Sequence, residues 1–189
     1  MTKEQFEKHV SNLSPQTVGE MHYGHFENFT KMTQLASPTS ILELGFNRGV
    51  SALMWLFNTS DECKLHSIDL RSKETVSKSL EYINSLFGDR FNYSHLDHSV
   101  LTEDFVKMAG MVNKYDLIFI DGDHTYNGIF RDTENALRMN PKFIAFDDYF
   151  HRAHGHDTQR VIKHFELEVL EEYKVDVGQA ITKNPHYKV

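Results

Sequence analysis

The sequence is poor in cysteine, in long apolar runs and in clustered positive charge. Cys63 is the only cysteine among 189 residues, which excludes an intrachain disulfide and a zinc site built from several cysteines. No apolar run approaches the roughly 20 residues that span a bilayer, and the polar start, residues 1–10, lacks the apolar core of a secretory signal. We therefore expect a cytoplasmic protein that does not partner a membrane.

The charge balance also narrows the expected partner. The formal net charge at pH 7 is -7, and lysine and arginine do not gather into a stripe that could follow a phosphate backbone. We therefore expect a small-molecule ligand and no nucleic acid. Hydrophobic residues make up 40% of the chain and charged residues 25%, which is typical of a globular protein. Because single domains hold roughly 100–200 residues, we expect one domain.

The hydrophobic pattern changes near residue 40. Between Val18 and Ala36, apolar residues recur mostly three or four positions apart, which predicts an amphipathic helix that ends near Pro38. We expect this N-terminal helical segment, residues 1–39, to pack on the core or to form a lid. Residues 40–189 then form the catalytic core of the same domain.

In residues 40–189, short apolar runs alternate with segments of helical spacing. This alternation predicts a doubly wound, Rossmann-like α/β fold with a mostly parallel sheet and helices on both faces. Residues 173–177 alternate like a half-exposed strand, and Gly178 permits a turn into residues 179–182, which predicts a C-terminal antiparallel hairpin. The expected parallel strands are residues 41–44, 64–68, 91–95, 116–120 and 143–146.

The segment from Ile41 to Ser51 combines a strand, a glycine turn and a helix start. Gly45 lets the backbone approach a ligand, and Gly49 lets the following helix pack closely. Their spacing, Gly-x-x-x-Gly, lacks the third glycine of the dinucleotide fingerprint, so NAD fits poorly. The turn therefore indicates another nucleoside ligand, or an ordinary structural turn.

Acidic residues stand at the ends of consecutive predicted strands, at Glu43, Asp69 and Asp97. One carboxylate can accept both hydroxyl protons of a ribose, and another can accept from an adenine amino group. Glu43 can fix the loop or bind the ammonium end of the ligand. Two alternatives stay open, since Asp69 can cap the next helix and Asp97 can be an ordinary loop acid.

Glu43, Gly45 and Gly49 together form the pattern Glu-x-Gly-x-x-x-Gly. With this pattern, the region from Ile41 to Asp148 resembles the class I S-adenosylmethionine-dependent methyltransferases. The resemblance implies that S-adenosylmethionine is the cofactor, that its methionine end contacts this loop, and that residues 40–189 form the cofactor-binding catalytic domain.

The same resemblance assigns the nucleoside contacts. It implies that Asp69 recognises the ribose. By similarity, the segment that contacts the adenine is residues 96–99, with Asp97 and Ser99 as its polar members.

A second acidic group follows the next two predicted strands. Asp121 follows the most apolar strand, and Asp147 and Asp148 follow the strand after it. Because adjacent parallel strands end at one edge of the sheet, we expect the carboxylates to converge and repel one another. A hard divalent cation would relieve that repulsion, and an all-oxygen donor set suits magnesium, manganese or calcium better than zinc. Alternatively, Asp121 caps the next helix and the other two lie in a solvated turn.

The string from Ile120 to Tyr126 resembles a narrower group, the metal-dependent O-methyltransferases related to macrocin O-methyltransferase. That resemblance implies metal ligands at Asp121, Asp147 and Asp148, with Mg²⁺ as the expected ion. It also implies that His124 is the general base, next to Asp121 in the catalytic centre.

These motifs predict S-adenosylmethionine-dependent O-methylation of a small hydroxylated acceptor, assisted by a divalent metal. One alternative is a homologue that keeps the cofactor pocket but runs a different, hydroxylase-like reaction, because fold does not determine chemistry. Another is a noncatalytic ligand-binding module. Since the chain is short, a second copy could close the acceptor side, so a homo-oligomer is a candidate assembly.

Overall fold

The computed structural model describes residues 1–15, 23–97, 101–108, 110–175 and 177–187. Its centre is a seven-stranded sheet in the order β3-β2-β1-β4-β5-β7-β6. The first five strands in the chain are mutually parallel, whereas β7 runs antiparallel to both β5 and β6. The architecture confirms the predicted Rossmann-like fold. The strands are β1 (Ser40–Leu44), β2 (Lys64–Asp69), β3 (Phe91–His95), β4 (Leu117–Ile120), β5 (Phe143–Phe146), β6 (Glu168–Tyr173) and β7 (Gln179–Lys183).

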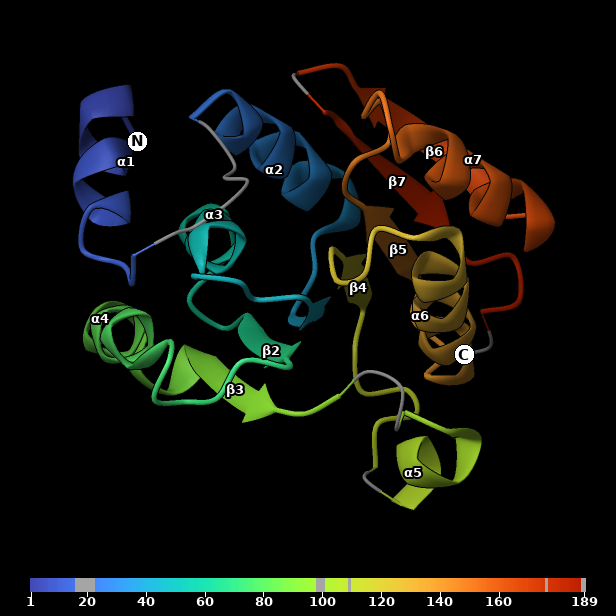
Figure 1. Cartoon of the computed structure of the whole chain (residues 1–189), viewed down its shortest axis with the longest axis horizontal. Helices are drawn as coiled ribbons and strands as arrows, with labels where there is room; N and C mark the ends of the chain where they lie inside the picture. The colour runs from blue at the N-terminus through green and yellow to red at the C-terminus, as the bar shows by residue number, and fades with distance from the viewer. Residues whose placement is uncertain (16–22, 98–100, 109, 176, 188–189) are drawn as a thin grey trace.

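Helices cover both faces of this sheet (Figure 1). One buried apolar layer joins the sheet to α2, α3 and α4, and a second layer joins it to α5, α6 and α7. The helices are α1 (Lys3–Val10), α2 (Tyr23–Ala36), α3 (Val50–Asn58), α4 (Ser77–Phe87), α5 (Glu103–Met108), α6 (Tyr126–Arg138) and α7 (Gly155–His164), with a short 3-10 turn at Gly88–Arg90.

The central strand β4 is buried along its whole length, as its continuous apolar sequence predicts. It lies between β1 and β5, so its carboxyl end and theirs meet at one edge of the sheet. The loops that follow these three strands carry Gly45, Asp121 and Asp147. The topology therefore brings the two motifs of the sequence together.

The C-terminal hairpin is confirmed, but its first strand lies earlier than predicted. The strand covers Glu168–Tyr173, whereas the alternating pattern was at residues 173–177. Beyond Tyr173 the chain turns, and the Gly178 amide donates to the Val175 carbonyl at 2.9 Å. Residue 176 lies outside the described residues. Alternation over so few residues did not distinguish a strand from the turn that follows it.

Helix α2 packs its apolar side onto the sheet. Phe29 and Met32 are fully buried, and the Phe29 ring lies 4.5 Å from that of Trp55 and 5.5 Å from that of Phe119, centroid to centroid. The helix ends at Ala36, as predicted, and residues 18–22 of the predicted range lie outside the described residues. Within the described ranges, no helix is both long and apolar enough to cross a bilayer.

Candidate active site

Gly45 brings the loop after β1 against the end of β4. Its φ is +103°, and a Cβ at this position would lie only 2.0 Å from the backbone carbonyl oxygen of Asp121. Gly49 has a φ of +91°, and a Cβ there would lie 2.6 Å from the Phe46 ring. Side chains would clash at both positions, so the glycines allow a tight loop whose first residue touches the Asp121 backbone.

Glu43 lies beneath this loop. The carboxyl is fully buried, and it accepts hydrogen bonds of 2.5 Å from the hydroxyls of Ser51 and Ser67. Burial raises the pKa of Glu43 to about 7, although the two hydroxyl bonds oppose the shift. These contacts tie β1, β2 and α3 together, which agrees with the loop-fixing alternative, and a contact with the ligand's ammonium group stays a prediction.

Asp69 clamps the loop to the end of β2. Its Oδ2 accepts from the backbone amides of Phe46 and Asn47 at 2.8 and 2.7 Å, and its Oδ1 accepts from the Arg71 amide at 2.8 Å. The side chain is almost fully buried. Asp69 therefore organises the loop directly, and its predicted bond to a ribose remains a prediction.

The predicted adenine segment is described only in part. The Leu96 amide donates to the Asp69 backbone carbonyl at 2.9 Å, which sets the start of the segment beside the end of β2. Asp97 is exposed, whereas Ser99 lies outside the described residues. The adenine contacts stay a prediction.

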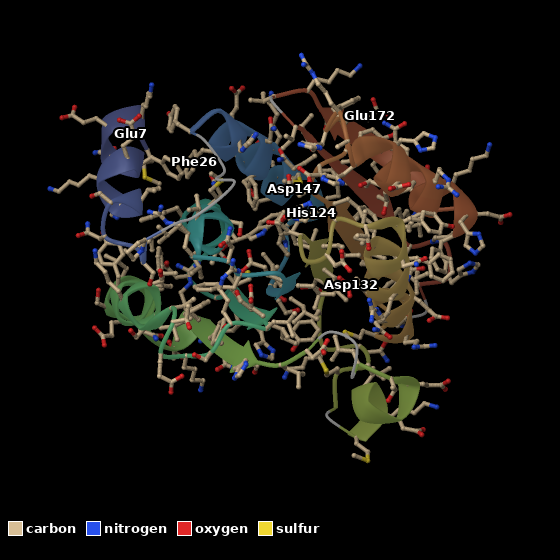
Figure 2. The ribbon with its side chains drawn as sticks, in the orientation of Figure 1. Glu7, Phe26, His124, Asp132, Asp147 and Glu172 are labelled. Atoms are coloured by element: carbon tan, nitrogen blue, oxygen red, sulfur yellow. The ribbon has the colours of Figure 1, made fainter. Side chains whose placement is uncertain are left out.

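Asp121, His124, Asp147 and Asp148 line one pocket at the ends of β4 and β5, together with Thr158 of α7. Figure 2 shows His124 and Asp147 close together near the middle of the molecule. The structure thus brings the predicted acidic residues and the predicted base to one place.

The carboxylates perturb one another. Burial, and then the neighbouring charge of Asp148, raise the pKa of Asp147 to about 6. Burial, followed by the charges of Asp147 and Asp148, raises the pKa of Asp121 well above its usual range. The pKa values rise because several buried negative charges without a counterion are unfavourable. Perturbed pKa values of this kind cluster at functional sites.

His124 pairs with one of these acids. Its Nδ1 is hydrogen-bonded to Oδ2 of Asp148, and its Nε2 lies 3.8 Å from Oδ1 of Asp121. The bond to Asp148 raises the pKa of His124 from its ordinary value, although burial opposes the shift. Asp148 has a φ of +57°, a left-handed conformation that aspartate adopts more readily than most residues, and it lines the pocket. An acid that holds one imidazole nitrogen leaves the other one for a substrate.

The chemistry of the carboxylate side chains supports the metal prediction, but their arrangement in the structure does not. Clustered carboxylates are the ligands that Mg²⁺ prefers. Among the residues that the structure describes, however, no group of three or more His, Cys, Asp or Glu side chains is arranged to hold an ion. Asp148 is bonded to His124 instead, and Asp147 accepts from the Gln179 side chain at 2.6 Å.

Comparison with known proteins identifies the family. Residues 42–149 match the family described as a methyltransferase domain. The chain belongs to this methyltransferase family. The match spans the glycine loop and both acidic segments, which confirms the predicted class of S-adenosylmethionine-dependent methyltransferases. The narrower macrocin-type assignment stays a prediction. No curated protein matches the sequence.

Solved structures share the fold of this methyltransferase at low sequence identity. An O-methyltransferase from Bacillus cereus, in complex with SAH, is 15% identical with a TM-score of 0.69, and the alignment covers 97% of this chain and 92% of the other. The SAH-bound methyltransferase PaMTH1 of Podospora anserina is 18% identical with a TM-score of 0.64, covering 98% and 87% of the two chains. At these identities the likeness shows the fold.

Sequence reasoning missed two residues of the methyltransferase's pocket region. Gln179 reaches Asp147 from β7, and Thr158 lines the pocket from α7. Gln179 is a polar residue at the start of a strand that continues with Ala180 and Ile181, and this polar position was the available signal. The Thr158 hydroxyl is buried without a hydrogen-bond partner among the described residues, and nothing in its local sequence predicts this.

Proposed function

We propose that this methyltransferase transfers the methyl group of S-adenosylmethionine to a hydroxyl oxygen of a small acceptor. The observation that carries the proposal is the contact between the donor loop and the acidic pocket. Gly45 touches the backbone of Asp121, three residues before His124. A methyl donor on the loop and an acceptor beside His124 would therefore be neighbours.

The donor side is supported by a loop that is already formed. Asp69 and Glu43 fix it through hydrogen bonds to backbone amides and to buried hydroxyls. The solved structures from Bacillus cereus and Podospora anserina hold SAH, the product that S-adenosylmethionine leaves after transfer. We expect the methionine end at Gly45 and Gly49, with the ribose toward Asp69.

The acceptor side contains a base in a suitable orientation. The Nδ1 of His124 is held by Asp148, so Nε2 can take the hydroxyl proton as the oxygen attacks the methyl carbon. An oxygen–carbon bond forms while the carbon–sulfur bond breaks, and the sulfonium becomes the neutral thioether of SAH. Asp148 then stabilises the imidazolium ion. Holding the two reactants in line supplies much of the acceleration.

The proposal also includes a divalent cation, which can be tested separately from the methyl transfer. Asp121, Asp147 and Asp148 would hold it, the last two through the carboxylate oxygens that are not bonded to Gln179 and His124, and when bound it would polarise the acceptor hydroxyl. Excess negative charge in the pocket favours a cation, and for the same reason it favours a neutral or cationic acceptor over an anionic one. A possible partner copy that covers the acceptor side also stays a prediction.

The proposed base is tested by separating chemistry from binding. His124→Ala should lower the single-turnover rate of methyl transfer by roughly 10²-fold or more, the usual contribution of general-base catalysis. The affinity for SAH, measured by calorimetry, should stay nearly constant because His124 faces the acceptor side. A normal rate between pH 6 and pH 9 would remove His124 from the mechanism. Donor binding without any transfer would favour a different reaction or a binding module.

A further inference from the structure

We propose that Asn28 and Gln179 are positioning residues that hold the Asp147 carboxylate in place through a buried hydrogen-bond relay from α2. Their importance for turnover rests on the proposed function, but the relay itself does not. Neither residue belongs to a motif of the sequence, and they are 151 positions apart.

The relay joins α2 and β7 to the residue that follows β5. The Asn28 Nδ2 on α2 donates to the Gln179 Oε1 at 2.7 Å, and the Gln179 Nε2 on β7 donates to the Asp147 Oδ1 at 2.6 Å. The antiparallel register pairs Phe146 with Ala180, so Gln179 is set beside the residue that follows β5. In Figure 2 the labelled Asp147 lies near α2, in agreement with this path.

Each member depends on the one before it. An amide side chain has one donating end and one accepting end, so a bond at one end decides which group the other end presents. Because Asn28 donates to the oxygen of Gln179, the amide nitrogen of Gln179 faces the carboxylate. The reverse orientation would place oxygen against oxygen at Asp147 and nitrogen against nitrogen at Asn28.

Burial makes the relay specific. Asn28 is 2% exposed, Gln179 is 0% exposed and Asp147 is 9% exposed. Water does not replace a lost partner at the depth of Asn28 and Gln179, so an unpaired amide there is costly. The same helix is also held at the hairpin, where the His25 Nε2 is hydrogen-bonded to the Val175 carbonyl at 3.1 Å. Helix α2 is thereby a structural part of the acidic pocket.

The relay is tested by NMR on the full chain, labelled with ¹⁵N in glutamine side chains and ¹³C in aspartate carboxyls. The wild type should show a Gln179 side-chain amide protected from hydrogen exchange, assigned by its loss in Gln179→Leu. Asn28→Leu should speed that exchange about tenfold or more, because the Gln179 oxygen loses its bond and the amide nitrogen is no longer fixed toward Asp147. It should also shift the Asp147 carboxyl signal, although Asn28 does not itself bond to Asp147.

Thr182→Val is the matched control. Thr182 is also fully buried on β7, and its hydroxyl donates to the Ile144 carbonyl at 2.9 Å. This variant should lower the unfolding temperature but leave the Asp147 signal in place. An Asp147 signal and a Gln179 exchange rate that are both unchanged in Asn28→Leu would overturn the proposal.

The double variant separates positioning from simple support of the fold. Asn28→Leu with Gln179→Leu should unfold at a higher temperature than Gln179→Leu alone, because it no longer buries an unpaired Asn28 amide. The Asp147 signal should nevertheless stay displaced as in Gln179→Leu. If the Asp147 signal of the double variant returned to its wild-type position along with the unfolding temperature, Asn28 and Gln179 would have structural roles only. Since no acceptor or turnover is needed, these results stand apart from any failure of the methyl transfer assay.

Discussion

A single added methyl group at Gly45 should separate the glycine loop from β4. In Gly45→Ala the new Cβ would lie 2.0 Å from the Asp121 carbonyl oxygen and 2.5 Å from its carbon. Real Cβ atoms essentially never come closer than 3.0 Å to such atoms, so the loop or the end of β4 must move by about the missing 1 Å. Both neighbours are backbone, which cannot turn aside as a flexible side chain does.

The cost of this substitution has two sources. A side chain at a φ of +103° adds backbone strain of about 1–3 kcal/mol. Relief of the overlap adds about 1–3 kcal/mol more, as other overpacked sites do. Gly45→Ala should therefore lose roughly 2–6 kcal/mol of unfolding free energy, a large part of the ~5–15 kcal/mol of a typical domain. The affinity for SAH should fall as well, because the loop would no longer hold its position.

Gly88→Ala is the control for this measurement. Gly88 also has a positive φ, +56°, but nothing lies within 4 Å of the Cβ it would gain. Its ψ is −126°, so an alanine there is strained as well, and Gly88→Ala should lose only this backbone strain of about 1–3 kcal/mol in urea unfolding at 25 °C, with SAH affinity unchanged. Equal losses in the two variants would show that the loop is not pressed against β4, and the reasoning about the joined donor and acceptor sites would fail.

Three further predictions test separate parts of the site and the fold. Asp69→Ala removes the acceptor of the Phe46, Asn47 and Arg71 amides, so calorimetry should show SAH binding weakened by about 1–3 kcal/mol. Unchanged affinity would show that neither these hydrogen bonds nor a ribose contact of Asp69 contributes to binding. Burial lowers the pKa of His66 to about 4. Between about pH 6.5 and pH 4, the imidazole therefore binds a proton in the unfolded chain but not in the folded chain. Stability should then be full above about pH 6.5 and decline by roughly 3 kcal/mol toward pH 4, and His66→Gln, compared with the wild type in urea unfolding, should flatten that decline if the assignment is right. Calorimetric titration with Mn²⁺ should show one binding site, and Asp121→Asn should abolish it without unfolding the chain. Undiminished methyl transfer after exhaustive chelation would remove the metal from the proposal.

The convergence of the two motifs could be predicted because it depends only on sheet topology. Apolar runs of strand length, separated by segments of helical spacing, predict a parallel sheet, and parallel strands end at one edge. Asp121 and Asp147 therefore met as expected. Gly45 was also predicted to make a close approach, although its immediate neighbour in the structure is the Asp121 backbone.

Other features depend on contacts that no local pattern encodes. The bond between Gln179 and Asp147 needs the register of β5 against β7, and the bond from Asn28 needs the packing of α2. The hydrogen bond between His124 and Asp148 needs β4 and β5 to be neighbours in the sheet, so that the segments after them meet. Helix α1 had an available signal that went unused, since Thr2 and Gln5 form a capping box.

Transfer of a labelled methyl group tests the central claim most directly. S-adenosylmethionine with a deuterated methyl would be incubated with wild-type protein and a metabolite extract, followed by mass spectrometry of the products. The account predicts equal amounts of SAH and of one deuteromethylated product, with the label on oxygen, and almost none of either with His124→Ala. SAH without a methylated product, a label on nitrogen or carbon, or equal transfer by His124→Ala would contradict it.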